Sequence, residues 1–145
     1  MQQEVRSDNI SPYVPWEIYR RTNYSAVCET LGVGDTFFLS EKTTKALWGK
    51  RIFVMFSAVN FLSRLRDQGF KTFSSIIDES YDQEIIPTRR INRLIKSLTE
   101  LYNSPDRQQK IKEMYRISHN GAIWEVQSPH WRCDTAIDDP DHKRL

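Results

Sequence analysis

The sequence predicts an α/β protein: a single domain with a short parallel sheet flanked by helices and a helical C-terminal part. Two observations support this prediction. In the first half of the chain, short apolar or β-branched segments alternate with helical patterns, which favours βαβ units. In the second half, apolar residues recur at helical spacing instead. The length of 145 residues is close to the usual size of one domain.

Three segments have the character of strands. Residues Tyr24–Thr30 are rich in strand-forming side chains, and a turn is expected directly after them at Leu31–Asp35. Ile52–Phe56 is continuously apolar, as in a strand that is covered on both faces of a parallel sheet. Phe70–Phe73 is extended and aromatic, and we expect a third, short strand there.

Helix signals lie between and after these segments. Ser40 is a good N-cap for a helix that reaches Trp48, and Gly49 is a suitable residue to close it. The apolar residues of Phe61–Leu65 fall on one helical face, and Gly69 stops that helix.

Two helices are expected in the C-terminal part. Apolar residues from Thr88 to Tyr102 follow the i, i+3, i+4, i+7 rule closely. Ser104-Pro105-Asp106 is a strong start for the second helix, because it supplies an N-cap, a proline and an acid in turn. Asn120-Gly121 is expected to end it.

The expected organisation is one α/β domain over residues 1–127, with an N-terminal arm at 1–15 and a loosely ordered tail at 128–145. The 21 basic and 19 acidic residues give a net charge of only +2, so bulk charge does not require a nucleic-acid partner. Cys28 and Cys133 form no metal-ligand pattern and indicate reduced thiols in the cytoplasm. No apolar run approaches the ~20 residues that span a bilayer, so no membrane partner is expected.

The most informative segment for function is the start of the helix at Ser40. Unpaired backbone N–H groups at a helix N-terminus attract a phosphate or diphosphate. The hydroxyls of Ser40 and Thr43 can add donors, and Lys42 can neutralise phosphate charge. Glu29 or Glu41 can accept hydrogen bonds from a ribose diol. These residues together describe a nucleotide pocket, whereas the plainer interpretation is a capped helix with a solvated face.

The same stretch resembles a known family. CETLGVGDTFFLSEKTTKALWGKRIFVMF is similar to the donor-binding segment of α-1,3-fucosyltransferase-like glycosyltransferases. Ser40, Glu41, Lys42 and Ala46 match the spacing of the family's Ser/Thr-Glu-Lys-x-x-x-Ala motif, and an apolar strand follows as in that family. The continuation LRDQGFKTF and then IDESYD resembles small glycosyltransferase-like proteins of tailed bacteriophages. The resemblance covers residues 15–120.

The resemblance implies a GT-B-like, Rossmann-type donor half that holds a nucleotide-sugar as its substrate, with no separate cofactor. Glu41 and Lys42 would lie at the ribose and the diphosphate, with Glu29 nearby. Family enzymes pair this half with an N-terminal acceptor half. For this chain we expect a second copy, as a homodimer, or another chain to complete the cleft. The acceptor and the general base are not assigned, and a phage-encoded protein would act in the host cytoplasm.

The sequence also allows a different class of function: a non-catalytic interaction module, or a nucleic-acid-associated module, that retains the fold. Basic residues on the helix after Thr88 would then contact phosphates. In the plainer interpretation this face is simply solvated. The basic residues concerned are Arg89, Arg90, Arg93 and Lys96.

Two further groups of residues bear on ligand binding. Three carboxylates fall within Asp78–Asp82, where they can bind a divalent ion or sugar hydroxyls, or form an acidic turn that caps the following helix. The histidines share neither a helical face nor a ligand spacing, so no metal site is predicted. They are His119, His130 and His142.

Overall fold

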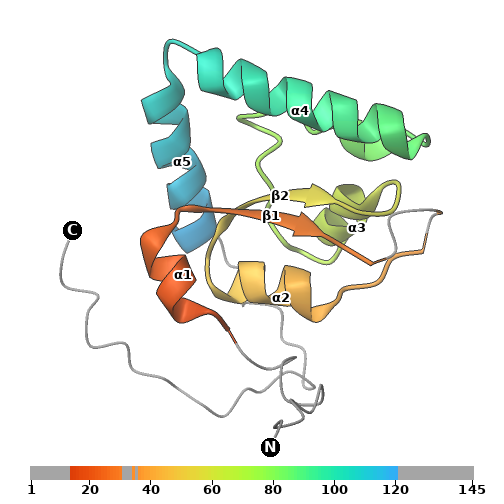
Figure 1. Cartoon of the computed structure of the whole chain (residues 1–145), viewed down its shortest axis with the longest axis horizontal. Coiled ribbons are helices and arrows are strands. Elements are labelled where there is room, and N and C mark those ends of the chain that lie inside the picture. Colours follow the sequence, from red (N-terminus) through yellow and green to blue (C-terminus); the bar gives the residue numbers. More distant parts are fainter. Residues whose placement is uncertain (1–13, 31–33, 35, 121–145) are drawn as a thin grey trace, which may run out of the picture.

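The computed structural model describes residues 14–30, 34 and 36–120, which form a mixed α/β structure (Figure 1). Helices flank one short parallel sheet, as the sequence predicts. The elements in chain order are α1 (Trp16–Arg21), β1 (Tyr24–Cys28), α2 (Glu41–Trp48), β2 (Ile52–Phe56), α3 (Phe61–Asp67), the 3-10 helix η2 (Ser80–Gln83), α4 (Pro87–Asn103) and α5 (Arg107–Asn120).

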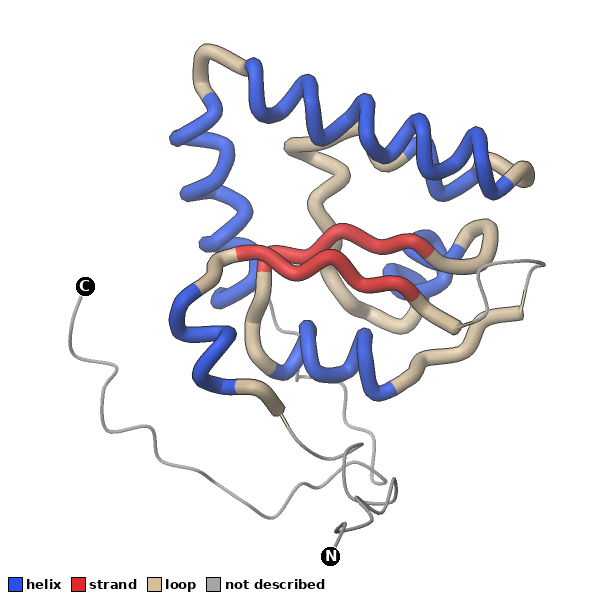
Figure 2. Tube along the Cα trace, in the orientation of Figure 1, coloured by secondary structure: helices blue, strands red, loops and turns tan. Residues whose placement is uncertain are grey.

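The sheet pairs β1 with β2 in parallel, from Tyr24 opposite Ile52 to Cys28 opposite Phe56. Helix α2 connects the two strands and packs against β1, which makes a βαβ unit. Figure 2 shows α2 on one side of the strands and α4 on the other, with α5 running past one end of the sheet. The predicted strand at Tyr24–Thr30 ends two residues early, although the N–H of Glu29 still donates to Phe56 O at 3.0 Å.

The core lies around β2, which is the more buried strand. Its continuous apolar sequence is explained by this position, because helices and loops cover both of its faces. The apolar faces of α2 and α3 pack into the core, and α4 and α5 add the buried apolar side chains of Leu94 and Met114. The most buried members are Ala46, Leu47, Ile52, Phe53, Met55, Phe61, Leu62, Leu65, Phe73, Tyr81 and Met114.

The third strand expected at Phe70–Phe73 is wrong. This segment is a loop that ends in a turn, where the N–H groups of Ile76 and Ile77 donate to Phe73 O at 2.9 and 3.0 Å. The N–H of Phe73 bonds to a Glu79 carboxylate oxygen at 2.8 Å and not to a neighbouring strand. The aromatic pattern has another cause, because the Phe73 ring packs in the core 5.2 Å from the Phe53 ring centroid.

Helix α1 was not predicted. It is six residues long and buries none of its side chains, so its sequence carries no apolar period. Tertiary contacts hold it in place: the ring of Trp16 lies 5.1 Å from that of Trp48 on α2. Arg51, at the start of β2, donates to Tyr19 O at 2.7 Å and to Thr22 Oγ1 at 2.7 Å.

The predicted C-terminal helices are confirmed with small shifts of their ends. Helix α4 extends the expected span by one residue at each end. The Ser104–Asp106 signal forms a turn, with Arg107 N donating to Ser104 O at 3.1 Å, and α5 begins directly after it. The structure describes α5 to Asn120. Gly121 and the predicted tail at 128–145 lie outside the described residues, as does most of the predicted arm at 1–15.

Candidate functional site

The tip of α2 has the capped geometry that the sequence predicts. The Ser40 side chain accepts from Lys42 N at 3.1 Å, and Ser40 O accepts from Thr44 N at 3.0 Å. At the other end, Gly49 N donates to Lys45 O at 2.9 Å. The helix therefore begins immediately after the loop that leaves the carboxyl end of β1, where parallel sheets bind their ligands.

Glu29 lies behind this tip and is buried. Its carboxylate accepts a hydrogen bond from Ser40 Oγ at 2.5 Å and another from Thr43 Oγ1. Thr43 is fully enclosed, with its hydroxyl also 3.7 Å from the Met55 sulfur. A buried carboxylate requires donors, and these two hydroxyls supply them.

This arrangement changes the roles that the sequence indicates. Each hydroxyl has one proton, and both protons are directed to Glu29, so neither Ser40 nor Thr43 has its donor directed at a phosphate. Glu29 is likewise turned toward the helix and away from solvent. The three residues form a brace, by which we mean Glu29, Ser40 and Thr43 together, that fixes the first turn of α2 to the end of β1.

The other two predicted site residues are exposed at the rim. Glu41 is the acidic residue of the first turn of α2, beside the positive end of the helix dipole. Lys42 reaches back to the chain beyond β1, with its Nζ 2.8 Å from Thr30 Oγ1. The structure therefore brings all five predicted residues to one helix tip, three as an internal brace and two facing solvent.

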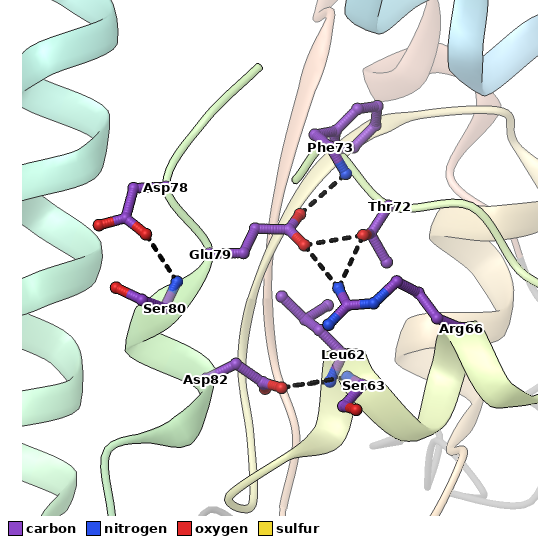
Figure 3. A network of polar contacts seen from close by, with 9 residues as sticks. All are labelled: Leu62, Ser63, Arg66, Thr72, Phe73, Asp78, Glu79, Ser80 and Asp82. Carbon is purple, nitrogen blue, oxygen red and sulfur yellow. Dashed lines mark hydrogen bonds and ion pairs between the residues drawn. The ribbon is translucent and has the colours of Figure 1, made fainter. Parts of the chain in front are cut away.

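A second polar group involves the acidic segment at 78–82 (Figure 3). Glu79 is buried and accepts from Arg66 Nη1 at 2.9 Å, from Thr72 Oγ1 at 2.7 Å and from Phe73 N at 2.8 Å. Burial raises the pKa of the Glu79 carboxyl above its usual value, and these donors and the Arg66 charge only partly oppose the rise. The residue ties the loop at Phe73 to helix α3.

Asp82 caps a helix, but a different helix from the one expected. Its carboxylate accepts from Leu62 N at 3.0 Å and Ser63 N at 3.1 Å, so it closes the N-terminus of α3 (Figure 3). We expected the acidic turn to cap the following helix, α4, whose first residue is instead Pro87. Burial also raises the pKa of Asp82. Asp78 is exposed and turned away from the other two, and the N–H of Ser80 lowers its pKa.

The basic face expected on α4 is only partly solvated. Arg90 is 1% exposed, with its guanidinium carbon 5.7 Å from the centroid of the Phe56 ring. Burial lowers the pKa of Arg90, while the charges of Asp82 and Glu84 act in the opposite direction. Arg93 pairs with Glu84 at 3.0 Å. Arg90 is thus a core residue of this part of the fold and is not available to a nucleic-acid backbone.

The described residues offer no ready metal centre, since no three or more His, Cys, Asp or Glu side chains among them are grouped around one point. His119 stacks on Tyr115 of α5 with ring centroids 3.7 Å apart, while His130 and His142 lie outside the described ranges. None of the described helices combines the length and apolarity that a bilayer crossing requires.

Sequence reasoning missed the brace as a structural unit and missed Arg90 as a buried group. A signal for the brace is present in the sequence: an acid directly follows the strand, and two hydroxyl residues stand at the N-cap and in the first turn of the next helix. Comparisons of the chain with protein-family models, with curated proteins and with solved structures find no match.

Proposed function

We propose that this chain binds a nucleoside diphosphate sugar at the tip of α2 and acts as a glycosyltransferase-like domain. The observation that carries the proposal is the pair Glu41 and Lys42, held exposed on a helix tip that the buried brace fixes to the carboxyl end of β1. A diphosphate bound there would meet backbone N–H groups and the positive end of the dipole. In this proposal the two-stranded sheet is the centre of a Rossmann-like, GT-B donor half.

Each site residue has a distinct role in this proposal. Lys42 would exchange its contact with Thr30, 2.8 Å away, for the diphosphate, to which it offers a mobile point charge. The Glu41 carboxylate would accept from the ribose diol. Glu29 is a positioning residue: it acts through Ser40 and Thr43 and does not touch the ligand. In this proposal Glu41 and Lys42 contact the ligand, whereas Glu29 supports the helix tip. The sequence resemblance does not make this distinction.

Sugar transfer places new negative charge on the departing nucleoside diphosphate as the glycosidic bond breaks. Pre-oriented N–H groups and a cation stabilise such charge more in the transition state than in the ground state. Lys42 and the first turn of α2 suit this task. The acceptor, and the base that activates it, would come from a second copy of the chain or from another protein.

The proposal is tested by calorimetric titration of the protein with a panel of nucleoside diphosphates and their sugar conjugates. We expect at least one member to bind, and Lys42→Ala to weaken that binding about 10–100-fold, since a charge-assisted contact contributes about 1.5–3 kcal/mol. Glu41→Gln should weaken the sugar conjugates and diphosphates alike, through the shared ribose. Lys71→Ala, which removes another exposed lysine, on the loop after α3, is the matched control and should bind normally.

Two results would overturn the proposal. One is a panel with no binding member. The other is equal weakening by Lys42→Ala and Lys71→Ala, which would reveal a general charge effect. If the panel is silent and the protein instead retards DNA or RNA in a salt-sensitive manner, the alternative of a nucleic-acid-associated module takes its place.

A further inference from the structure

The outer edge of β1 is an open strand edge. Among the described residues β1 pairs with β2 alone, and a sheet of two strands is marginal by itself. Glu29 N donates toward β2. Backbone groups alternate along a strand, so the N–H and C=O groups of Tyr24, Ala26 and Cys28 point to the outer edge. The sequence of β1 contains no proline or charged residue, which are the usual devices that protect an edge, so this edge is suited to strand pairing.

Helix α4 carries an apolar stripe that the sheet leaves partly uncovered. Its members follow the i, i+4, i+7, i+11 spacing of one helical face, and they are Ile91, Ile95, Leu98 and Tyr102. Three of the four are exposed, and Leu98 is half-buried. A groove of about 730 Å³ lies between this stripe and the sheet, and it is lined by residues of β1 and β2 together with Leu98 and Tyr102. The sheet is therefore too narrow to cover the apolar face of α4.

The stripe lies on the side of the open edge. Tyr24 of β1 lines the groove together with Leu98 and Tyr102. The other flank of α4 is occupied, because Ser97 Oγ donates to Asp78 O at 2.7 Å. Figure 1 shows α4 running antiparallel to β1 across one face of the sheet. An open strand edge and an uncovered helix face are thus adjacent, and one partner can cover both.

We propose that this partner is a second copy of the chain, whose β1 pairs antiparallel with β1 about a two-fold axis at Ala26. The strand has five residues, and the first, third and fifth direct their backbone groups outward. The edge is therefore self-complementary: Ala26 lies opposite Ala26 of the partner subunit, and Tyr24 lies opposite Cys28 of the partner subunit. Each of these opposed pairs exchanges two backbone hydrogen bonds. The result is one continuous sheet of four strands.

The two copies of α4 fit this pairing. Residues of β1 and β2 line the same groove as α4, so the helix faces both strands. Neighbouring strands lie about 4.8 Å apart, and a helix centred over β1 and β2 is then about 10 Å from its symmetry mate across the new sheet. Packed helices have interaxial distances of about 8–10 Å. The two helices run antiparallel, so Ile91 and Ile95 at the start of one stripe meet Tyr102 at the end of the other.

The exposed apolar area approaches what a stable dimer needs. Tyr24 and Tyr102 are 51% and 69% exposed, and Ile91 and Ile95 are 41% and 54% exposed. At about 200 Å² for an aromatic side chain and about 100 Å² for isoleucine, these four residues leave about 300–400 Å² of apolar surface in each copy. Two copies bury about twice this area, and the paired strand edges bring the total toward the ~1,200 Å² of the smallest specific interfaces.

Charge favours the antiparallel direction. Lys42 lies near the carboxyl end of β1, with its Nζ 2.8 Å from Thr30 Oγ1. Antiparallel pairing places the two copies of Lys42 at opposite ends of the interface, whereas parallel pairing would set these like charges side by side. The start of the partner's β1 then lies beside the carboxyl end of β1, where the proposed function requires a second chain. The interface itself is inferred from the strand edge and the helix face, and not from the proposed function.

Sedimentation equilibrium of the full chain at micromolar concentrations tests the dimer, and we expect a molecular mass twice that of the chain. Ile95→Glu places a charge in the apolar stripe of both copies and should weaken dimerisation at least about tenfold. Asn92→Glu is the matched control, since it adds the same charge at another exposed position of α4 that lies outside the stripe. It should leave the dimer unchanged. Circular dichroism checks that both variants keep the fold.

Engineered cysteines test the register. In a background of Cys28→Ser with Cys133→Ser, Ala26→Cys sets two thiols opposite each other on the two-fold axis, with Cα atoms about 5.5 Å apart and within the range of a disulfide. Mild oxidation should then give a covalent dimer. Tyr24→Cys in the same background is the control, because its two copies lie about 13 Å apart along the strands and should not cross-link. Restoring Cys28 should allow Tyr24→Cys to cross-link, since these residues are opposed.

Three results would overturn the inference. The first is a monomer at every concentration, which would mean that the edge is not paired with a second copy. The second is equal dissociation by Ile95→Glu and Asn92→Glu. The third is a disulfide that forms as fast from Tyr24→Cys as from Ala26→Cys in the background that lacks Cys28. A silent nucleotide panel bears on the proposed function alone, so the failure of one proposal is distinguishable from the failure of the other.

Discussion

Replacing Glu29 by alanine tests whether the brace fixes the start of α2. The carboxylate accepts from the buried hydroxyls of Ser40 and Thr43, and alanine leaves both without their acceptor. An unsatisfied buried polar group costs about 1–3 kcal/mol, so we expect Glu29→Ala to lower the free energy of unfolding by about 2–4 kcal/mol. Part of this cost is offset because the variant no longer buries a carboxylate.

A double-mutant cycle isolates the contact itself. Thr43→Val alone removes one donor to the buried carboxylate and should cost about 1–2 kcal/mol. In the Glu29→Ala background the hydroxyl is already unsatisfied, so its replacement should cost little. The two changes should therefore be coupled by about 1–2 kcal/mol.

Urea unfolding followed by far-UV circular dichroism measures these free energies, provided that the slopes with denaturant agree among the variants. Thr99→Val is the control. The Thr99 hydroxyl bonds to Ile95 O at 2.8 Å within α4 and shares no contact with Glu29. The effects of Thr99→Val and Glu29→Ala on the free energy of unfolding should therefore be additive. A coupling between Glu29 and Thr43 below about 0.5 kcal/mol, the usual limit of additivity, would refute the brace.

Two further predictions concern buried charges. Arg51 donates to Tyr19 O, Thr22 Oγ1, Tyr24 O and Ser25 Oγ at 2.7–3.2 Å, so Arg51→Lys should cost about 2–3 kcal/mol in urea unfolding, and an unchanged midpoint would contradict this. Burial raises the pKa of Asp82, so the folded state holds its proton more tightly than the unfolded chain. The wild type should therefore lose stability relative to Asp82→Asn as pH rises above about 4, and a relative gain would show that the pKa shift has the opposite sign.

Local patterns in the sequence predicted several elements closely. Ser40 and Gly49 bound α2 as expected, Ile52–Phe56 is the buried strand, and the apolar period after Thr88 gives α4. These features depend on residues within a few positions of one another: a cap bonds to the next turn, and a helical face repeats every three or four residues. A single sequence displays such relations directly.

The sequence-based predictions that the structure contradicts share a physical cause. The aromatic residues of the 70–73 segment suggested a strand, yet Phe73 packs in the core and bonds to Glu79. Arg90 belongs to a polar run and is nevertheless buried beside Phe56. In each case the partner lies on another segment, and no local period identifies it.

The sequence by itself determined the α/β class, the βαβ unit and the cluster of candidate residues at the start of α2, because short-range hydrogen bonds and apolar spacing specify them. Only the tertiary structure decided what those residues do. It placed Glu29 inside, joined to Ser40 and Thr43, and left Glu41 and Lys42 facing solvent. Burial distinguishes the residues that support the helix tip from those that face solvent. Burial in turn depends on how segments that are distant in the sequence pack together.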